Sequence, residues 1–441
     1  MIREYGNCFR SAGKGKHWSM RYGILEYKNP NIINIGDGMQ IISVLNLYRQ
    51  WGVDEKEIIR VSYFDLETYD GEEVLLPICF PMYGYNMHNH VTCWSSKIIP
   101  VFLSLSLFDT NLSEADIEYL KRFEPIGCRD AFTAEGLQKC GVRAYLNGCI
   151  TLTLDGERNA HNGKKVFLID VPEEFEQCMP EELRTDVCRH THIFHRIGMR
   201  TDEYARKLME QYEREASIVI TGRMHAALPC YSAGLPVIFV HPEWSYRFTW
   251  LEDVLPVYLP EERKKIEWSG SRIADNEKAL KIRAYMKEIA KVRVMDREEP
   301  DTLIETLQEL YAGRTKRDYV RGPYDVTVDY LREHWNEEIE AEYMVWGVSQ
   351  VASALIDFIR VNYPKAKLTG VIDASKTESF KGLIPQKIET VTNIGEIFVF
   401  VTADAVNPYA LDYFRKIGKP EDSSFFCWEH ISVGEGTLPI V

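Results

Sequence analysis

Short apolar runs rich in β-branched residues alternate along this chain with amphipathic, charged segments. We expect strands at 58–64, 97–105, 165–171, 217–221 and 236–240, and helices at 38–51, 113–123, 131–140 and 201–215. Strands that alternate with helices in this way build α/β layers around mostly parallel sheets. The pattern therefore predicts an α/β protein.

The length of the chain, 441 residues, is enough for two or three domains. Residues 155–165 are polar, contain two glycines and lack apolar periodicity, which indicates a linker. We predict an N-terminal α/β domain over 1–160, a second α/β domain over 161–315, and a small Rossmann-like α/β domain over 325–441. In the last of these, Gly347 is a single glycine at a strand-to-helix turn where the dinucleotide-binding fingerprint has three, so we interpret the domain as a folding or partner-docking unit.

The charge and hydropathy of the chain exclude two classes of partner. A formal net charge of −14 argues against nucleic acid, because proteins that bind a phosphate backbone are normally basic. No segment approaches the roughly 18 apolar residues of a membrane span, and the N-terminus lacks the apolar core of a signal peptide. We expect a cytoplasmic protein whose membrane association, if any, is peripheral. The sequence leaves the oligomeric state open, a homo-oligomer included.

Residues 216–240, ASIVITGRMHAALPCYSAGLPVIFV, place two polar side chains inside an apolar frame. We expect a buried strand up to Thr221 and a short helix from Ala226, with Pro229 tolerated only in its first turn and Gly234 at its end. Between strand and helix the sequence holds an arginine and a histidine, and ligands of open α/β sheets bind at this edge.

The polar pair of this segment is Arg223 and His225. Taken alone, an arginine after a strand is typical of a surface ion pair, and a lone histidine near a core is typical of a structural residue. Together they favour a functional role, since two polar groups in an apolar frame are costly to bury unless they are satisfied. Free backbone N–H groups at a helix N-terminus also suit an anion.

Residues 124–142 repeat this arrangement in the first predicted domain. A short apolar run meets Arg129 and Asp130 before a helix, so Asp130 is expected to cap that helix while Arg129 projects from the strand end. If the two domains face each other, Arg129 and Arg223 point into one cleft. Two guanidinium groups and an imidazole would suit a small, multiply charged anion.

These segments resemble the polysaccharide pyruvyl transferase family over about residues 30–260. Residues 220–240 resemble its Arg-Leu-His segment, with Met224 in place of the usual leucine. The other resembling segments are NIINIGDGMQIISV (31–44), IGCRDAFTAEGLQKCGV (126–142), NGCITLTL (147–154) and RFTWLEDVLPVY (247–258). Some family members carry a histidine close to the position of Leu107, where this chain has none.

The resemblance implies two Rossmann-like domains in a glycosyltransferase-B-like arrangement. It implies that the enolpyruvyl group of phosphoenolpyruvate is transferred to a sugar diol of a glycan or glycan precursor, forming a ketal, with no cofactor. The partners would be this small anionic donor and a sugar acceptor. The implied catalytic residues are His225, Arg223 and Arg129, and the expected substrate-binding residues are Asn34, Gly36, Asp37, His192 and Arg247.

The implied chemistry needs anion clamps and one group that titrates near neutrality. An acid protonates the methylene carbon of the donor, a base takes the proton of an attacking hydroxyl, phosphate leaves, and a second hydroxyl closes the ring. We assign Arg129 and Arg223 to the carboxylate and phosphate and His225 to acid–base work. Asp37 has a simpler alternative as the N-cap of the helix that follows it.

Two other functions remain open at this point. One is a glycosyltransferase in which Arg129 and Arg223 bind the diphosphate of a nucleotide sugar, and the other is a non-catalytic binding protein of a polysaccharide locus. Two histidine-rich segments, MHNHVTCW (87–94) and CRHTHIFH (188–195), lack the paired Cys-x2-Cys spacing of a structural zinc site. We therefore expect no metal, and interpret His192 as able to reach the cleft.

Overall fold

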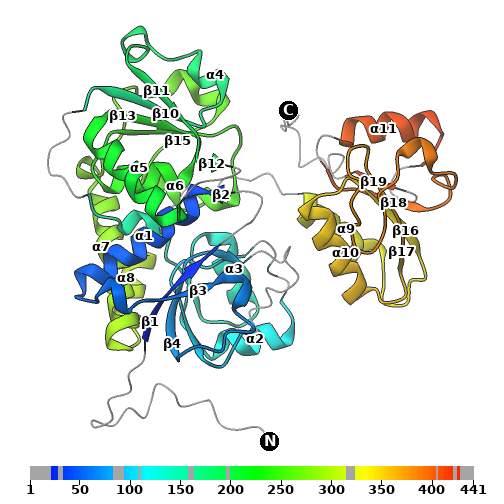
Figure 1. Cartoon of the computed structure of the whole chain (residues 1–441), viewed down its shortest axis with the longest axis horizontal. Helices are drawn as coiled ribbons and strands as arrows, with labels where there is room; N and C mark the ends of the chain where they lie inside the picture. The colour runs from blue at the N-terminus through cyan, green and yellow to red at the C-terminus, as the bar shows by residue number, and fades with distance from the viewer. Residues whose placement is uncertain are drawn as a thin grey trace, which may run out of the picture. The chain divides into compact units, whose positions relative to one another are not determined.

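The structure is a computed structural model that describes residues 21–27, 33–82, 94–107, 110, 112–156, 163–194, 199–313, 323–403, 406–420 and 425–427 (Figure 1). The described residues form two compact units. Those of the first unit lie between residues 21 and 313, and those of the second between 323 and 427. The predicted division of the first unit near residue 160 stays a prediction.

The first unit begins with a parallel sheet of four strands in the order β3-β1-β4-β6. Its strands are β1 (Arg21–Glu26), β3 (Ile59–Ser62), β4 (Val74–Ile78) and β6 (Ile98–Phe102). Two parallel two-stranded pairs accompany this sheet: β5 (Pro81–Met82) with β7 (Ser106–Leu107), and β8 (Ile126–Cys128) with β9 (Ala144–Leu146). The helices of this region are α2 (Glu114–Lys121) and α3 (Ala131–Lys139).

The second sheet of this unit has five parallel strands in the order β11-β10-β13-β14-β15. They are β10 (Lys165–Ile169), β11 (Val187–His190), β13 (Ala216–Thr221), β14 (Val237–Val240) and β15 (Val257–Tyr258). The accompanying helices are α4 (Glu173–Glu176), α5 (Thr201–Glu215), α6 (Met224–Ser232), α7 (Glu277–Lys291) and α8 (Asp301–Tyr311).

Helix α1 (Ile35–Gln50) joins the two sheets of the first unit, and it is buried from its first residue to Tyr48 apart from partly exposed Asp37. It packs against α5, α6 and β1. Just before it, β2 (Ile33–Asn34) pairs antiparallel with β12 (Ile193–Phe194), and the Ile35 N–H donates to the His192 carbonyl at 2.8 Å. Figure 1 shows β2, β12 and α6 gathered at this end of α1.

The second unit holds a parallel sheet of four strands in the order β17-β16-β18-β19. The strands are β16 (Glu342–Trp346), β17 (Lys367–Ile372), β18 (Phe398–Val401) and β19 (Phe425–Cys427), and the helices are α9 (Pro323–His334), α10 (Gln350–Asn362) and α11 (Asn407–Lys416). The predicted mixed α/β class with parallel sheets is therefore confirmed, and the sheets are consistent with Rossmann-like folds. Among the described helices, none is long and apolar enough to cross a membrane.

Two local predictions were wrong. Helix α1 begins at Ile35 rather than at 38, because the Asn34 side chain accepts the Gly36 N–H at 2.9 Å and caps it; Asp37 therefore lies inside the first turn and is not the cap. Helix α6 begins at Met224, so Pro229 lies inside the helix rather than in its first turn. The missing N–H of Pro229 removes one helical hydrogen bond, which the tight packing of this buried helix offsets.

A glycine on α1 allows its close approach to α5. A Cβ atom at Gly38 would lie 2.5 Å from the Thr201 carbonyl oxygen, which is backbone and cannot rotate away. We predict that Gly38→Ala lowers the free energy of unfolding by about 1–3 kcal/mol, although alanine is the better helix former. Urea denaturation measures this effect.

The matched control is Gly313→Ala, where an added Cβ meets no atom within 4 Å. It should change stability by less than about 0.5 kcal/mol. A Gly38→Ala protein as stable as the wild type would contradict the close contact of α1 with α5.

Candidate active site

Arg129 follows β8 and is fully buried. Its Nη2 donates to Gln40 Oε1 at 2.6 Å and to the Cys79 carbonyl at 2.5 Å. Its Nε and Nη1 have no hydrogen-bond partner among the described residues. Burying donors of a charged group without acceptors is costly, so one edge of this guanidinium is suited to receive an anion.

The turn that holds Arg129 is fixed by the residue after it. Asp130 Oδ1 accepts the Thr133 N–H at 2.8 Å, and its Oδ2 accepts the Ser106 hydroxyl at 2.7 Å. The predicted N-cap of α3 is therefore confirmed. With both carboxylate oxygens used in this way, Asp130 fixes the backbone from which Arg129 extends.

His225 lies in the first turn of α6, beside the start of α1. Its Nε2 is 3.4 Å from Cys149 Sγ, and a Cβ at Gly36 would come within 2.7 Å of its Nδ1. Only glycine at position 36 lets the two helix starts approach this closely. Burial, together with the positive charges of Arg129 and Arg247, holds the pKa of His225 well below its usual value, so the imidazole is neutral at pH 7.

Asp37 lies in the first turn of α1. Its pKa is raised, whereas the pKa of His225 is lowered. Loss of hydration raises it to about 7, and Arg129 and Arg247 oppose this rise without cancelling it. The carboxyl is therefore partly protonated at neutral pH. Neighbouring groups whose pKa values are displaced from their usual ranges are typical of acid–base sites.

The second arginine whose charge lowers the pKa values of Asp37 and His225 is Arg247, which lies in the turn Tyr246–Phe248 after β14. Arg223, which the sequence placed with Arg129, instead forms an ion pair with Asp170 at 2.9 Å, and its side chain is 43% exposed. The structure thus brings Arg129 together with Arg247, Asp37 and His225 and leaves Arg223 at the edge.

His192 lies beside this group and is buried. Its Nε2 is 3.0 Å from the Tyr212 hydroxyl, and its backbone N–H donates to Asp170 Oδ2 at 3.0 Å. Loss of hydration lowers its pKa to about 3. His192 in turn contributes to the low pKa of His225, so the two imidazoles are neighbours.

The remaining predicted residues have local roles in the structure. Asn34 caps α1 with its side chain, Gly36 gives His225 its space, and Leu107 is buried in β7. His88, His90, Cys93 and His195 of the histidine-rich segments lie outside the described residues. Within the described part of the chain, no group of three His, Cys, Asp or Glu side chains could hold a metal ion.

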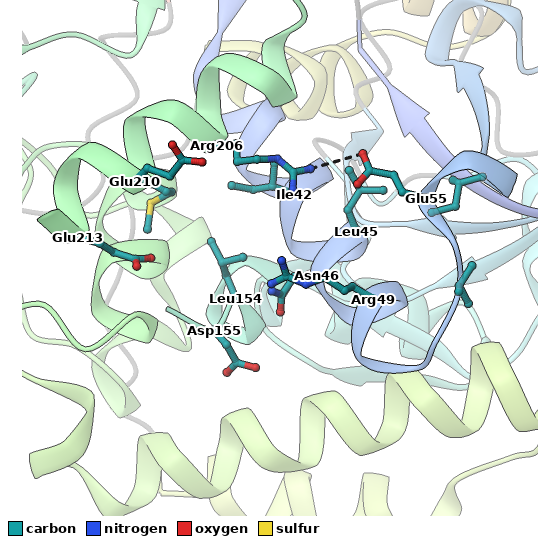
Figure 2. A pocket seen from close by; sticks show the side chains of 13 residues that line it. Ile42, Leu45, Asn46, Arg49, Glu55, Leu154, Asp155, Arg206, Glu210 and Glu213 are labelled. Atoms are coloured by element: carbon teal, nitrogen blue, oxygen red, sulfur yellow. Dashed lines mark ion pairs between the residues drawn. The ribbon is translucent and has the colours of Figure 1, made fainter. Parts of the chain in front are cut away.

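A pocket of about 120 Å³ lies further along α1 and takes in none of the predicted site residues (Figure 2). Its lining comes from α1, α5 and the segment around Leu154 and Asp155, and it includes the ion pair of Arg206 with Glu55 at 3.5 Å. Its lining combines carboxylates and guanidinium groups with apolar side chains.

Sequence reasoning missed several residues of the site, among them Gln40, Cys79, Cys149 and Tyr212. Gln40 carried a usable signal, because an amide inside the apolar run of a buried helix needs a polar partner. Cys149 and Tyr212 carried none, since a thiol in an apolar run, or a phenol on the apolar face of an amphipathic helix, is typical of an ordinary core residue.

Comparison with known proteins adds a family. Residues 34–242 match the family model described as polysaccharide pyruvyl transferase, and no curated protein matches the chain. One similar solved structure is the functionally uncharacterized protein KP1_0663 of Klebsiella pneumoniae, with a TM-score of 0.33 and 16% identity over 51% of this chain and 84% of that one. Another is a chain of the structure described as accessory secretory protein 1, 2 and 3 in Streptococcus pneumoniae, with a TM-score of 0.30 and 13% identity over 56% of each chain.

The matched segment carries Asn34, Asp37, Arg129, Arg223 and His225, and it ends just before Arg247. Over residues 34–242, this chain thus matches the model of the polysaccharide pyruvyl transferase family, a family of transferases.

Proposed function

We propose that this protein transfers the enolpyruvyl group of phosphoenolpyruvate to a sugar diol of a glycan or glycan precursor. The observation that supports this most directly is the gathering of Arg129, Arg247, Asp37 and His225 at the start of α1. We extend the proposal to the architecture, in which the two parallel sheets of the first unit form a glycosyltransferase-B-like pair.

The donor is a compact anion with a carboxylate and a phosphate. Arg129 offers the buried Nε and Nη1 edge, a geometry that suits a carboxylate or phosphate bound through two parallel hydrogen bonds. Arg247 supplies the second positive charge. Arg223 is held by Asp170 and would meet the substrate only at the rim.

The proton chemistry follows from the two displaced pKa values. Asp37, with a pKa of about 7, gives a proton to the methylene carbon, and the carbon bearing the phosphate becomes oxocarbenium-like. His225, neutral at rest, takes the proton of the sugar hydroxyl as its oxygen bonds to that carbon. The carbon–oxygen bond to phosphate then breaks, and the second hydroxyl closes the ketal as the departing phosphate takes its proton.

Ligand-dependent stability tests the donor. Phosphoenolpyruvate should raise the unfolding temperature, by the equivalent of about 2.7 kcal/mol at a concentration of 100 times Kd. Arg247→Gln should weaken its binding about 10- to 100-fold, because a hydrogen-bonded charge pair is lost. A matched control is Arg214→Gln, which removes a surface arginine paired with Glu215 and should bind normally.

Stabilisation by nucleoside diphosphate sugars and not by phosphoenolpyruvate would favour a glycosyltransferase instead. Stabilisation by neither would favour the non-catalytic binding protein.

Removal of the imidazole tests the acid–base assignment. His225→Gln keeps a polar side chain of similar size and should lower pyruvate incorporation by about 10²–10⁴-fold in kcat. His334→Gln removes a histidine of the second unit that stacks on Tyr330, and should leave the rate unchanged. Near-normal turnover of a folded His225→Gln enzyme would contradict the mechanism.

The raised pKa of Asp37 predicts a pH dependence of anion binding. Below about pH 7 the carboxyl is neutral and leaves both arginines to the anion, whereas above it the carboxylate competes for them. The affinity for sulfate, whose own charge is constant in this range, should therefore fall as the pH rises through about 7. Isothermal titration of Asp37→Asn should show no such fall, and an unchanged pH profile in that variant would assign the dependence elsewhere.

A further inference from the structure

A chain of side-chain contacts leads from the edge of the second sheet to His192. Cys188 Sγ is 3.4 Å from His190 Nε2, and His190 Nδ1 is 3.2 Å from the Tyr212 hydroxyl. The same hydroxyl is 3.0 Å from His192 Nε2. Four protonatable side chains thus form one unbroken path.

Local structure explains why these residues meet. Cys188 and His190 are two residues apart on the edge strand β11, so both side chains lie on one face of the sheet. Tyr212 comes from the last turns of α5, and its ring lies 16° from parallel to that of His192. The segment CRHTHIFH, considered above as a metal site, therefore supplies three of the four members of the path.

The two ends of the path differ in exposure. Cys188 and His190 are partly exposed, whereas Tyr212 is fully buried and His192 is 1% exposed. At the inner end, His192 Nδ1 is buried and has no hydrogen-bond partner among the described residues. This end adjoins His225 and the start of α1, where the Ile35 N–H donates a hydrogen bond to the His192 carbonyl.

We propose that His190, Tyr212 and His192 form a proton relay between solvent and the donor site. The role of this relay in turnover rests on the proposed function. The hydrogen-bonded path itself depends only on the three side chains. Cys188 is the outer hydrogen-bond partner of His190.

The protons balance in each transfer. In the resting state His192 donates Nε2–H to Tyr212, Tyr212 donates its hydroxyl to His190 Nδ1, and His190 carries its own proton on Nε2. When His192 Nδ1 receives a proton from the site, the Nε2 proton moves to Tyr212 and the hydroxyl proton moves to His190. The former Nε2 proton of His190 then leaves to water, and every residue is again neutral.

This transfer reverses both tautomers, so the next transfer must run inward. Water then protonates His190 Nε2, and His192 releases the proton on Nδ1 to the site. The proposed reaction uses both directions, because one proton leaves a sugar hydroxyl and another enters the methylene carbon. A neutral imidazole can donate and accept at once, which the low pKa of His192 preserves at neutral pH.

The first test is independent of activity. Ring ¹⁵N NMR of the full chain reports which nitrogen of His192 carries the proton, with the signal assigned by its loss in His192→Gln. We expect His190→Ala to change the tautomer ratio of His192 when Tyr212 is present and to leave it unchanged in a Tyr212→Phe background. An unchanged ratio in the wild-type background overturns the relay, whatever the enzyme does.

The second test uses turnover with phosphoenolpyruvate. Tyr212→Phe removes one hydroxyl and should lower kcat by on the order of 10²-fold with little change in KM. The matched control Tyr204→Phe removes a hydroxyl from the same helix, from a ring packed on Phe194, and should have no effect. Because His190 is partly exposed, imidazole in the buffer should restore the rate of His190→Ala.

The two tests separate the possible failures. Coupled tautomers without turnover of phosphoenolpyruvate keep the relay and reject the proposed function. Wild-type turnover of Tyr212→Phe, or a slow His190→Ala that imidazole does not restore, overturns the relay as part of the reaction. If Tyr212→Phe does not fold, His190→Ala and its rescue decide the question alone.

Discussion

The site depends on the contact between the start of α1 and the part of the first unit that contains the second sheet. Two antiparallel residue pairs between β2 and β12, and the hydrogen bond from the Ile35 N–H to the His192 carbonyl, fix this contact. It brings residues near position 36 within reach of residues near 192 and 225. Glycine at position 36 then permits an approach that any larger residue would block.

Burial at this junction determines the chemistry of the titratable groups. The same loss of hydration raises the pKa of Asp37 and lowers the pKa of His225, because it disfavours whichever form is charged. The two arginine charges lower both values, and they leave Asp37 partly protonated and His225 neutral. An anion held by these arginines would remove part of their effect on His225 and raise its pKa, which couples donor binding to the readiness of the imidazole to accept a proton.

Much of the fold was predictable from residues that are neighbours in the chain. The β-branched run before Thr221 forms β13, the amphipathic segment 201–215 forms α5, and Asp130 caps α3 as its position indicated. Strand β1 was missed because Arg21–Glu26 begins and ends with charged residues and contains a glycine. The start of α1 was placed too late because Asp37 was considered as its cap, whereas Asn34, three residues earlier and paired with β12, caps the helix.

The sequence by itself determined the α/β class, the strand-to-helix turns that carry Arg129 and His225, and the family resemblance, because these depend on patterns a few residues long. Only the tertiary structure decided that Arg247 rather than Arg223 accompanies Arg129, that Asp37 titrates near pH 7, and that Tyr212 links two histidines. The physical reason is that proximity between distant segments is set by how the helices dock. Hydration, which sets each pKa, depends on all the side chains that gather around a group and so cannot be read from its neighbours in the chain.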